Sequence, residues 1–162
     1  MNYRVSVHYA QERAARFRAE VNALRELPDE RFDMAHWVQM LNESKRKLPF
    51  AGYLCMDLQR KEVDGQEVCG TVLCFAGNIA PRHWQPGVTP NQTIPDFAAN
   101  FLGIPGGFSN TLFLVTNWLH PGFRLRYEEA TAGWVRKDAA IDYFLWYENY
   151  VLPYLAIPVE TL

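Results

Sequence analysis

The sequence has almost no excess of charge of either sign. Its 162 residues include 16 Lys and Arg against 18 Asp and Glu, for a formal net charge of -2. Proteins that follow a nucleic-acid backbone need a basic stripe to neutralise phosphates. The one dense basic run, Lys45-Arg46-Lys47, has Glu43 beside it and is typical of a solvated loop. We therefore predict no nucleic-acid partner.

Long hydrophobic runs are also missing. No apolar stretch approaches the roughly 18 residues that a membrane-spanning helix needs. The opening stretch, MNYRVSVHYAQERAARFRAE, contains no apolar segment of the kind found in secretory signals. Cysteine is scarce and odd in number, with three in the chain, as expected for free thiols in a reducing compartment. The sequence thus predicts a cytoplasmic protein with no membrane association.

Several signatures of cofactor chemistry are absent. The sequence has neither a P-loop nor a G-x-G-x-x-G motif, and GIPGG at residues 103–107 lacks the Lys-Ser/Thr that would follow a phosphate loop. The carboxylates are scattered, so no pair indicates two-carboxylate catalysis. We predict no cofactor.

The chain is rich in apolar residues (49%) and aromatic residues (14%), and its length is that of one ordinary domain. Hydrophobic periodicity and breaking residues predict a strand at 3–9, helices at 11–27 and about 33–41, a hairpin at 52–68 around Asp64-Gly65, and helices at 71–79, 95–102, 110–115 and 131–151. Asp33 and Ser109 are predicted caps, Pro81 is predicted to end its helix, and 131–151 is predicted to be the longest. The predicted fold class is mainly α (α+β), a single globular domain over residues 1–162 with a small β-hairpin or sheet.

The stretch EVCGTVLCFAG, residues 67–77, holds two of the three cysteines beside small residues. The free amide groups at a helix start stabilise a thiolate and lower its pKa. Cys69 takes that position if the helix begins just after it, and Gly70 would let a substrate approach closely. A cysteine nucleophile also needs a base, usually His. Cys69 and His120 are therefore the candidate catalytic residues.

Two other interpretations of this stretch stay open. Cysteine often serves as a small buried apolar residue, so Cys69, Cys74 and Gly77 would let a neighbouring element pack closely. A metal site could be assembled from the two cysteines with His83 or His120. A zinc site needs three or four ligands, however, and no second Cys or His pair follows. We predict no metal site.

Two motifs in the chain resemble a group of bacterial and bacteriophage proteins. Phe32-Asp33-Met34 followed by Trp37 has the form F-x-M-x-x-W, and residues 69–77 have the form C-G-T-x-x-C-x-A-G. The similarity spans about residues 31–150, and the group's continuation is matched by Leu102-Gly103, Leu112-Phe113 and Trp118. The resemblance implies a small phage or prophage accessory protein. No activity is established for the group, so it implies no catalytic residues.

Aromatic residues concentrate in two loop segments and one helix. His83-Trp84 and Trp118 with His120 precede breaks in the chain, where they either anchor loops in the core or rim a groove. The predicted C-terminal helix is apolar or aromatic on nearly every side, so one face must meet the N-terminal helix, a second copy or another protein. The candidate binding residues are Trp84, Trp118, Tyr143, Trp146, Tyr147 and Tyr150.

The function that we predict is protein binding. The chain is interpreted as a small cytoplasmic interaction protein, phage-encoded as the resemblance implies, that binds a host or partner protein or forms a homo-oligomer. The alternative is a cysteine-dependent hydrolase or transferase that uses Cys69.

Overall fold

The computed structural model describes residues 3–29, 32, 38–40, 71–85, 87–89 and 92–156. These residues are mainly helical, which confirms the mainly α prediction. The helices are α1 (Tyr3–Glu26), α3 (Phe75–His83), α4 (Ile94–Leu102), α5 (Asn110–Phe113), α6 (Pro121–Glu129) and α7 (Gly133–Tyr150). The strands are β1 (Val38–Met40) and β2 (Thr71–Leu73), and the short 3-10 turns are η3 (Gly106–Phe108), η4 (Val115–Asn117) and η5 (Leu152–Tyr154). The predicted hairpin around Asp64-Gly65 lies outside the described residues.

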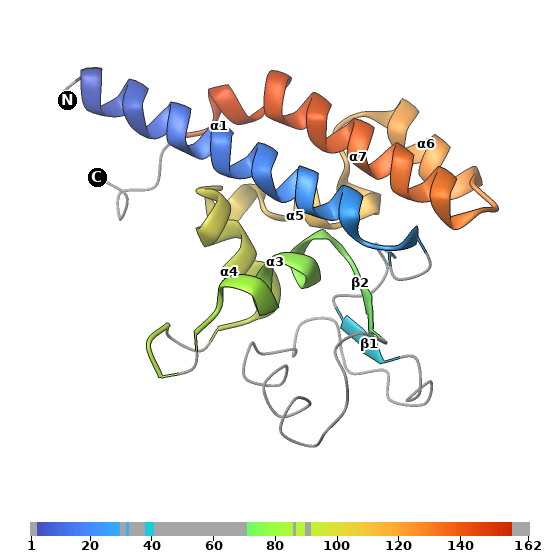
Figure 1. Ribbon diagram of the computed structural model, residues 1–162. Helices are drawn as coiled ribbons and strands as arrows, with labels where there is room; N and C mark the ends of the chain where they lie inside the picture. Colours follow the sequence, from blue (N-terminus) through green and yellow to red (C-terminus); the bar gives the residue numbers. More distant parts are fainter. Residues whose placement is uncertain are drawn as a thin grey trace.

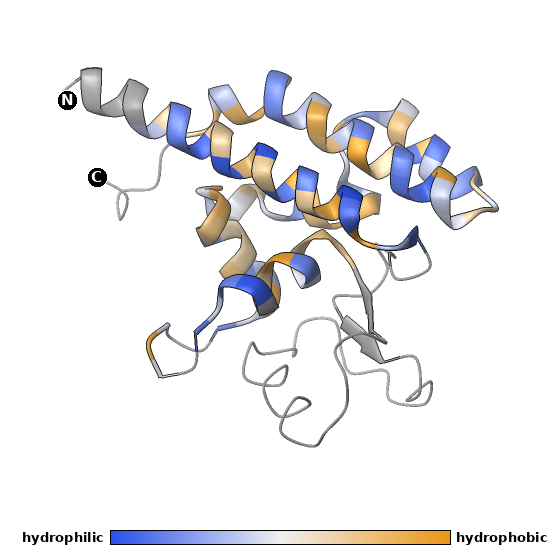
Figure 2. Ribbon diagram, in the orientation of Figure 1, coloured by the Kyte–Doolittle hydropathy of each residue, from blue (hydrophilic) through white to orange (hydrophobic). Residues whose placement is uncertain are grey.

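Helices α1 and α7 run antiparallel across the molecule (Figure 1). Phe17 of α1 stacks on Tyr147 of α7 with ring centroids 6.0 Å apart. Near the other end of the pair, Lys137 donates to the carbonyl of Arg25 at 2.8 Å. Helices α3 and α4 pack against each other and against α1, below it in the view of Figure 1, and α6 packs against α7. Both long helices alternate between polar and apolar residues (Figure 2), as expected for helices with one buried side.

The core is built largely from aromatic rings. Phe75, in the first turn of α3, stacks on Phe144 of α7 with centroids 4.3 Å apart, and it contacts Phe17 edge-on at 5.9 Å. Phe113 of α5 completes this group at 6.2 Å from Phe75. All four side chains are buried, so one core joins α1, α3, α5 and α7. None of the described helices is long and apolar enough to cross a membrane.

The predicted strand at residues 3–9 is wrong, because these residues form the start of α1. Their alternation of apolar and polar residues suggested a strand. Extending an existing helix adds one hydrogen bond per residue without a new nucleation penalty. A strand without a neighbour would leave its backbone groups unpaired. As a result α1, with 24 residues, is longer than α7, with 18, and the prediction that 131–151 is the longest helix is also wrong.

The predicted helix at 33–41 is wrong for Val38–Met40, which form β1. This strand pairs antiparallel with β2, and Val38 lies opposite Leu73 while Met40 lies opposite Thr71. The β-branched residues of this pair suit a strand, and mutual pairing satisfies the backbone groups of both segments. The other residues of that predicted helix, including the cap at Asp33, lie outside the described residues.

The helix predicted at 71–79 begins at Phe75 instead of Thr71, since residues 71–73 form β2. Pro81 was expected to end it but lies inside α3, which continues to His83. The missing amide of a proline is tolerated here because the helix still closes beyond it, where the Trp84 N–H donates to the Ala80 carbonyl at 2.9 Å.

Two short helices were predicted close to their observed positions. Helix α4 begins at Ile94, capped by the Thr93 hydroxyl, and ends at Gly103 with φ 70°, a conformation that favours glycine. Helix α5 starts after Ser109 as predicted, but the serine side chain makes no capping hydrogen bond. Helix α6 was not predicted, although Pro121 at its first position is a recognised start signal.

Candidate functional site

The sequence predicted that Cys69 lies at the start of a helix, but in the structure the cysteine at the helix start is Cys74. Cys69 lies outside the described residues, and β2 separates it from the first residue of α3. Cys74 is the N-cap of α3, is 0% exposed, and its Sγ accepts a hydrogen bond from the Gly77 N–H at 3.3 Å. A thiol with no exposed surface has no access to a substrate, so Cys74 acts as a buried cap. Among the described residues, no group of three or more His, Cys, Asp or Glu could hold a metal ion.

His120, the candidate base, is the N-cap of α6. Its Nδ1 accepts hydrogen bonds from the backbone N–H groups of Gly122 at 3.1 Å and Phe123 at 3.4 Å. An imidazole nitrogen that accepts carries no proton, so the proton of the neutral ring sits on Nε2. A Cβ at Gly122 would lie 2.9 Å from the His120 ring, so glycine is needed for the ring to sit over the helix start. The ring is therefore held in one orientation with Nε2–H as a donor.

The two Trp and two His residues predicted to rim a groove belong to separate parts of the molecule. His83 contacts Glu20 and stacks on Phe101, whereas His120 contacts Phe123 and Trp146. Helices α3 and α6, which carry the two histidines, are well separated in Figure 1.

The two tryptophans of that prediction differ in burial. Trp118 is buried, donates from Nε1 to the Leu112 carbonyl at 3.1 Å, and stacks on Tyr143 with centroids 4.3 Å apart. Trp84 is half-buried at the end of α3, where it packs against the core. Trp118 therefore anchors its loop and is not available to a partner.

The four aromatic candidates on α7 divide by burial. Tyr143 and Tyr147 are completely buried. The Tyr143 hydroxyl donates to the Thr111 carbonyl and accepts from the Leu119 N–H at 3.1 Å. The Tyr147 hydroxyl lies 3.0 Å from Thr111 Oγ1. Burial raises the pKa of both phenols above the ordinary value. These two residues are core residues rather than binding residues.

The other two candidates, Trp146 and Tyr150, reach the surface. Trp146 is half-buried, and Tyr150 is 66% exposed one turn further along α7, with ring centroids 5.9 Å apart. His120 meets Trp146 edge-on at 5.1 Å, and Phe123 lies 6.4 Å from the same ring. We call His120, Phe123, Trp146 and Tyr150 the aromatic surface. Sequence reasoning named only part of it, because it missed helix α6, which supplies Phe123.

Charged groups next to the aromatic surface are paired with one another. Helix α7 packs against both α6 and α1 in this part of the molecule. The pairs are Arg124–Glu128 at 2.9 Å, Arg126–Asp142 at 3.0 Å and Arg18–Glu148 at 2.6 Å. These exposed pairs contribute little to stability. They leave the surroundings of the aromatic surface nearly neutral.

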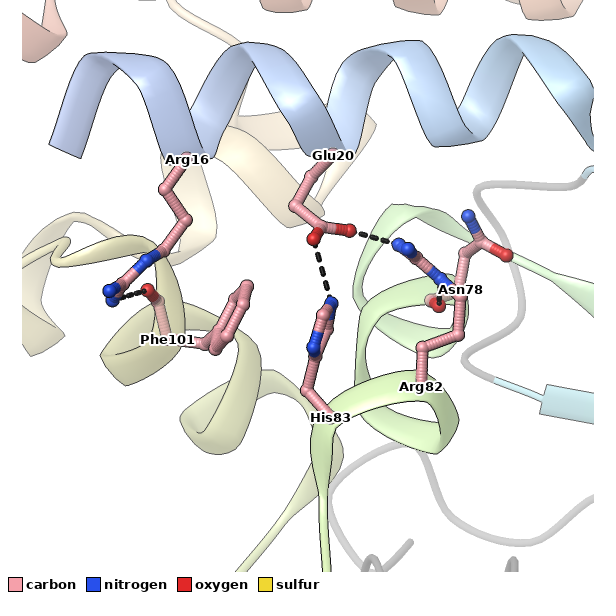
Figure 3. A network of polar contacts seen from close by, with 6 residues as sticks. All are labelled: Arg16, Glu20, Asn78, Arg82, His83 and Phe101. Atoms are coloured by element: carbon pink, nitrogen blue, oxygen red, sulfur yellow. Dashed lines mark hydrogen bonds and ion pairs between the residues drawn. The ribbon is translucent and has the colours of Figure 1, made fainter. Parts of the chain in front are cut away.

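A second polar cluster, which sequence reasoning missed, joins α1 to α3 and α4 (Figure 3). The Glu20 carboxylate is almost fully buried, pairs with Arg82 and lies 2.8 Å from His83 Nε2. The His83 ring stacks on Phe101 at 4.1 Å, and Arg16 donates to the Phe101 carbonyl at 2.9 Å. Glu20 looked like one of the polar residues of an amphipathic helix, so only its long-range contacts identify it.

This cluster has part of the geometry of a general base. A buried carboxylate that holds one nitrogen of a histidine fixes the orientation of the ring. Catalysis would also require a nucleophile within reach, whereas the His83 ring is engaged by Glu20 and Phe101, and neither is a nucleophile of this kind. The contacts present fasten α3 to α1, which is the role we assign to Glu20.

Two buried cations fasten the middle and the carboxyl end of α1. The Arg13 guanidinium donates to the carbonyls of Leu152 at 2.6 Å, Leu155 at 2.9 Å, Ala156 at 3.1 Å and Gly103 at 3.3 Å. Burial lowers the pKa of Arg13. Lys137 caps the carboxyl end of α1 through the carbonyls of residues 25 and 27. The hydrogen bonds of both side chains go to backbone carbonyls, Lys137 also pairs with Asp29 at 3.3 Å, and we assign both a structural role.

Comparison with known proteins adds no assignment: no family model, curated protein or solved structure matches this chain.

Proposed function

We propose that the protein is a small cytoplasmic interaction protein that binds another protein through the aromatic surface of α6 and α7. The observation that supports this is the half-exposed row of rings formed by His120, Phe123, Trp146 and Tyr150. Aromatic residues are enriched at binding hot spots because they cover a large area with few rotatable bonds.

The rigid support beneath the rings favours binding. Trp146 stacks on the buried Tyr143 with centroids 5.8 Å apart. The Tyr143 hydroxyl also holds the Leu119 N–H, in the loop before α6. The His120 ring is fixed by the hydrogen bonds that its Nδ1 accepts from two backbone N–H groups. A surface whose side chains are already ordered loses less entropy when a partner binds.

The proposal is tested by capture from a bacterial lysate followed by mass spectrometry. The tagged wild-type protein is compared with Tyr150→Ala and with Trp134→Ala, which removes a ring that is 60% exposed near the other end of α7. We expect a partner that wild type and Trp134→Ala retain and Tyr150→Ala loses. Light scattering on the same proteins detects self-association. Equal capture and equal mass for all three would contradict the proposal.

The alternative of a cysteine-dependent enzyme rests on Cys69 alone. It is tested by alkylation of the native protein at mildly acidic pH, where only a thiol with a depressed pKa reacts fast. Mass spectrometry of the peptides separates Cys69 from Cys74, which serves as the internal control because it is fully buried. Reaction at Cys69 only after unfolding would remove the enzyme alternative.

A further inference from the structure

The aromatic surface has an excess of hydrogen-bond donors. We propose that it recognises a proline-rich, extended segment of the partner, an inference that rests on the proposed function and specifies the chemistry of its ligand. Such segments adopt the polyproline II conformation, a left-handed helix without internal hydrogen bonds.

The donors are His120 Nε2–H, Trp146 Nε1–H and the Tyr150 hydroxyl. None of these atoms has a hydrogen-bond partner within the described residues. Arg13 Nε is the only buried side-chain nitrogen or oxygen among those residues that lacks a partner, so the three donors reach the surface. His120 Nδ1 already accepts hydrogen bonds from two backbone N–H groups, so it is not available to accept one from a ligand. A matching ligand must therefore supply acceptors.

The charged side chains around the rings are paired with one another, so charge complementarity favours an uncharged ligand. The charged side chains of α6 and α7 near the rings form ion pairs: Arg124 with Glu128 and Arg126 with Asp142. Arg126 also lies over the Phe123 ring, 5.7 Å from its centroid. A cationic ligand would meet this guanidinium and would face donors rather than carboxylates. The surface thus disfavours a quaternary ammonium group, the usual guest of aromatic cages.

A proline-rich segment meets these conditions. Proline has a carbonyl but no N–H, so a run of prolines presents acceptors without competing donors. The pyrrolidine rings are apolar and pack against aromatic faces, as in other proline-recognition grooves. Two residues of polyproline II advance about 6 Å. The ring centroids of Trp146 and Tyr150 are 5.9 Å apart, so the two rings can contact residues two positions apart in one such segment.

The test is a titration of the full-length protein followed by NMR of the tryptophan indole N–H groups. Trp146 is assigned from the signal lost in Trp146→Phe. The probes are decaproline and repeats of Pro-Pro-Leu, with a Gly-Ser repeat of equal length and choline as comparison ligands. We expect a saturable shift of the Trp146 signal with at least one proline-rich probe and no shift with the comparison ligands.

Two variants separate the contacts. Tyr150→Ala should weaken binding of the proline-rich probe about tenfold, as expected when a hot-spot ring is removed. His120→Asn keeps an N-cap residue for α6 but removes the Nε2–H donor, and it should also weaken binding. Trp134→Phe should leave the affinity unchanged, since Trp134 lies near the opposite end of α7.

The outcomes separate this inference from the proposed function. If no proline-rich probe shifts Trp146 while the Tyr150-dependent partner is still captured from lysate, the ligand class is wrong and the binding function stands. A Trp146 shift with choline alone overturns the ligand class in the same way. If Tyr150→Ala changes neither capture nor any titration, both proposals fail.

Discussion

Helix α7 carries similar aromatic residues in two different roles. Tyr143 and Tyr147 face α1 and α5, where both rings are fully buried and both hydroxyls are satisfied around Thr111. Trp146 is half-buried and Tyr150 is exposed at the end of the helix, and their polar atoms find no partner within the described residues. Aromatic residues on one helix thus divide into a structural set and an exposed set. Removing a residue of each kind should separate stability from binding.

The largest effect is expected on the buried side. Tyr147→Ala removes a ring that stacks on Phe17 and should lower the free energy of unfolding by about 3–5 kcal/mol, as in other large core truncations. Tyr143→Ala should behave alike, because its ring stacks on Trp118. Chemical denaturation measures both. A loss below about 1 kcal/mol would show that these rings do not hold the core together.

The next effect concerns the end of α1 that contacts α7. Lys137→Met keeps the aliphatic stem but removes the ammonium that binds the carbonyls of Arg25 and Leu27. Hydrogen bonds to charged groups are worth about 1.5–3 kcal/mol, and the loss of unfolding free energy should fall in that range. Asp138→Ala, at the exposed neighbouring position, is the control and should change stability little. Equal stability of Lys137→Met and wild type would contradict the capping role.

Alkaline pH should lower the stability of the protein through the buried tyrosines Tyr143 and Tyr147. Burial raises the pKa of Tyr143 and Tyr147 above that of an unfolded tyrosine, about 10. The stability tied to these neutral phenols is fully present below pH about 10 and is lost as the pH rises toward their folded-state pKa values. Melting temperature should therefore fall above that pH, and less steeply in Tyr147→Phe. A parallel fall in both proteins would remove Tyr147 as a cause.

The smallest effect on stability is expected on the exposed side. Tyr150→Ala should change the free energy of unfolding by less than about 0.5 kcal/mol, as is usual for surface positions. The same variant should lose the captured partner. Comparing its melting curve with its capture result isolates binding from folding. A strong destabilisation would mean that Tyr150 belongs with the structural set.

Local sequence patterns predicted the elements that depend on local interactions. Helix α4 was predicted closely because Pro95 near its start and the breaking glycine after it lie within a short stretch. Residues 3–9 were predicted as a strand from two-residue alternation, although helix extension from the residues that follow prevailed. The start of α3 was misplaced because β2 depends on pairing with β1, which lies far away in the sequence.

The candidate site was only partly predictable for the same reason. The abundance of aromatic residues on α7 indicated more rings than one core face could bury. It did not indicate which ones would remain exposed. Glu20 and Arg13 gave no local signal, since their partners His83 and Leu152 are distant in the sequence. Helix α6 had a local signal in Pro121, and its omission hid the role of Phe123.

By itself, the sequence determined a mainly helical protein with aromatic residues in excess along its last helix, because composition, periodicity and breaking residues act over a few neighbouring positions. The tertiary structure alone decided that Tyr143 and Tyr147 belong to the core, that Trp146 is half-buried and that Tyr150 is exposed. That division depends on where α1 and α5 pack against α7. Burial is a property of the surrounding elements, and a residue's own side chain does not specify it.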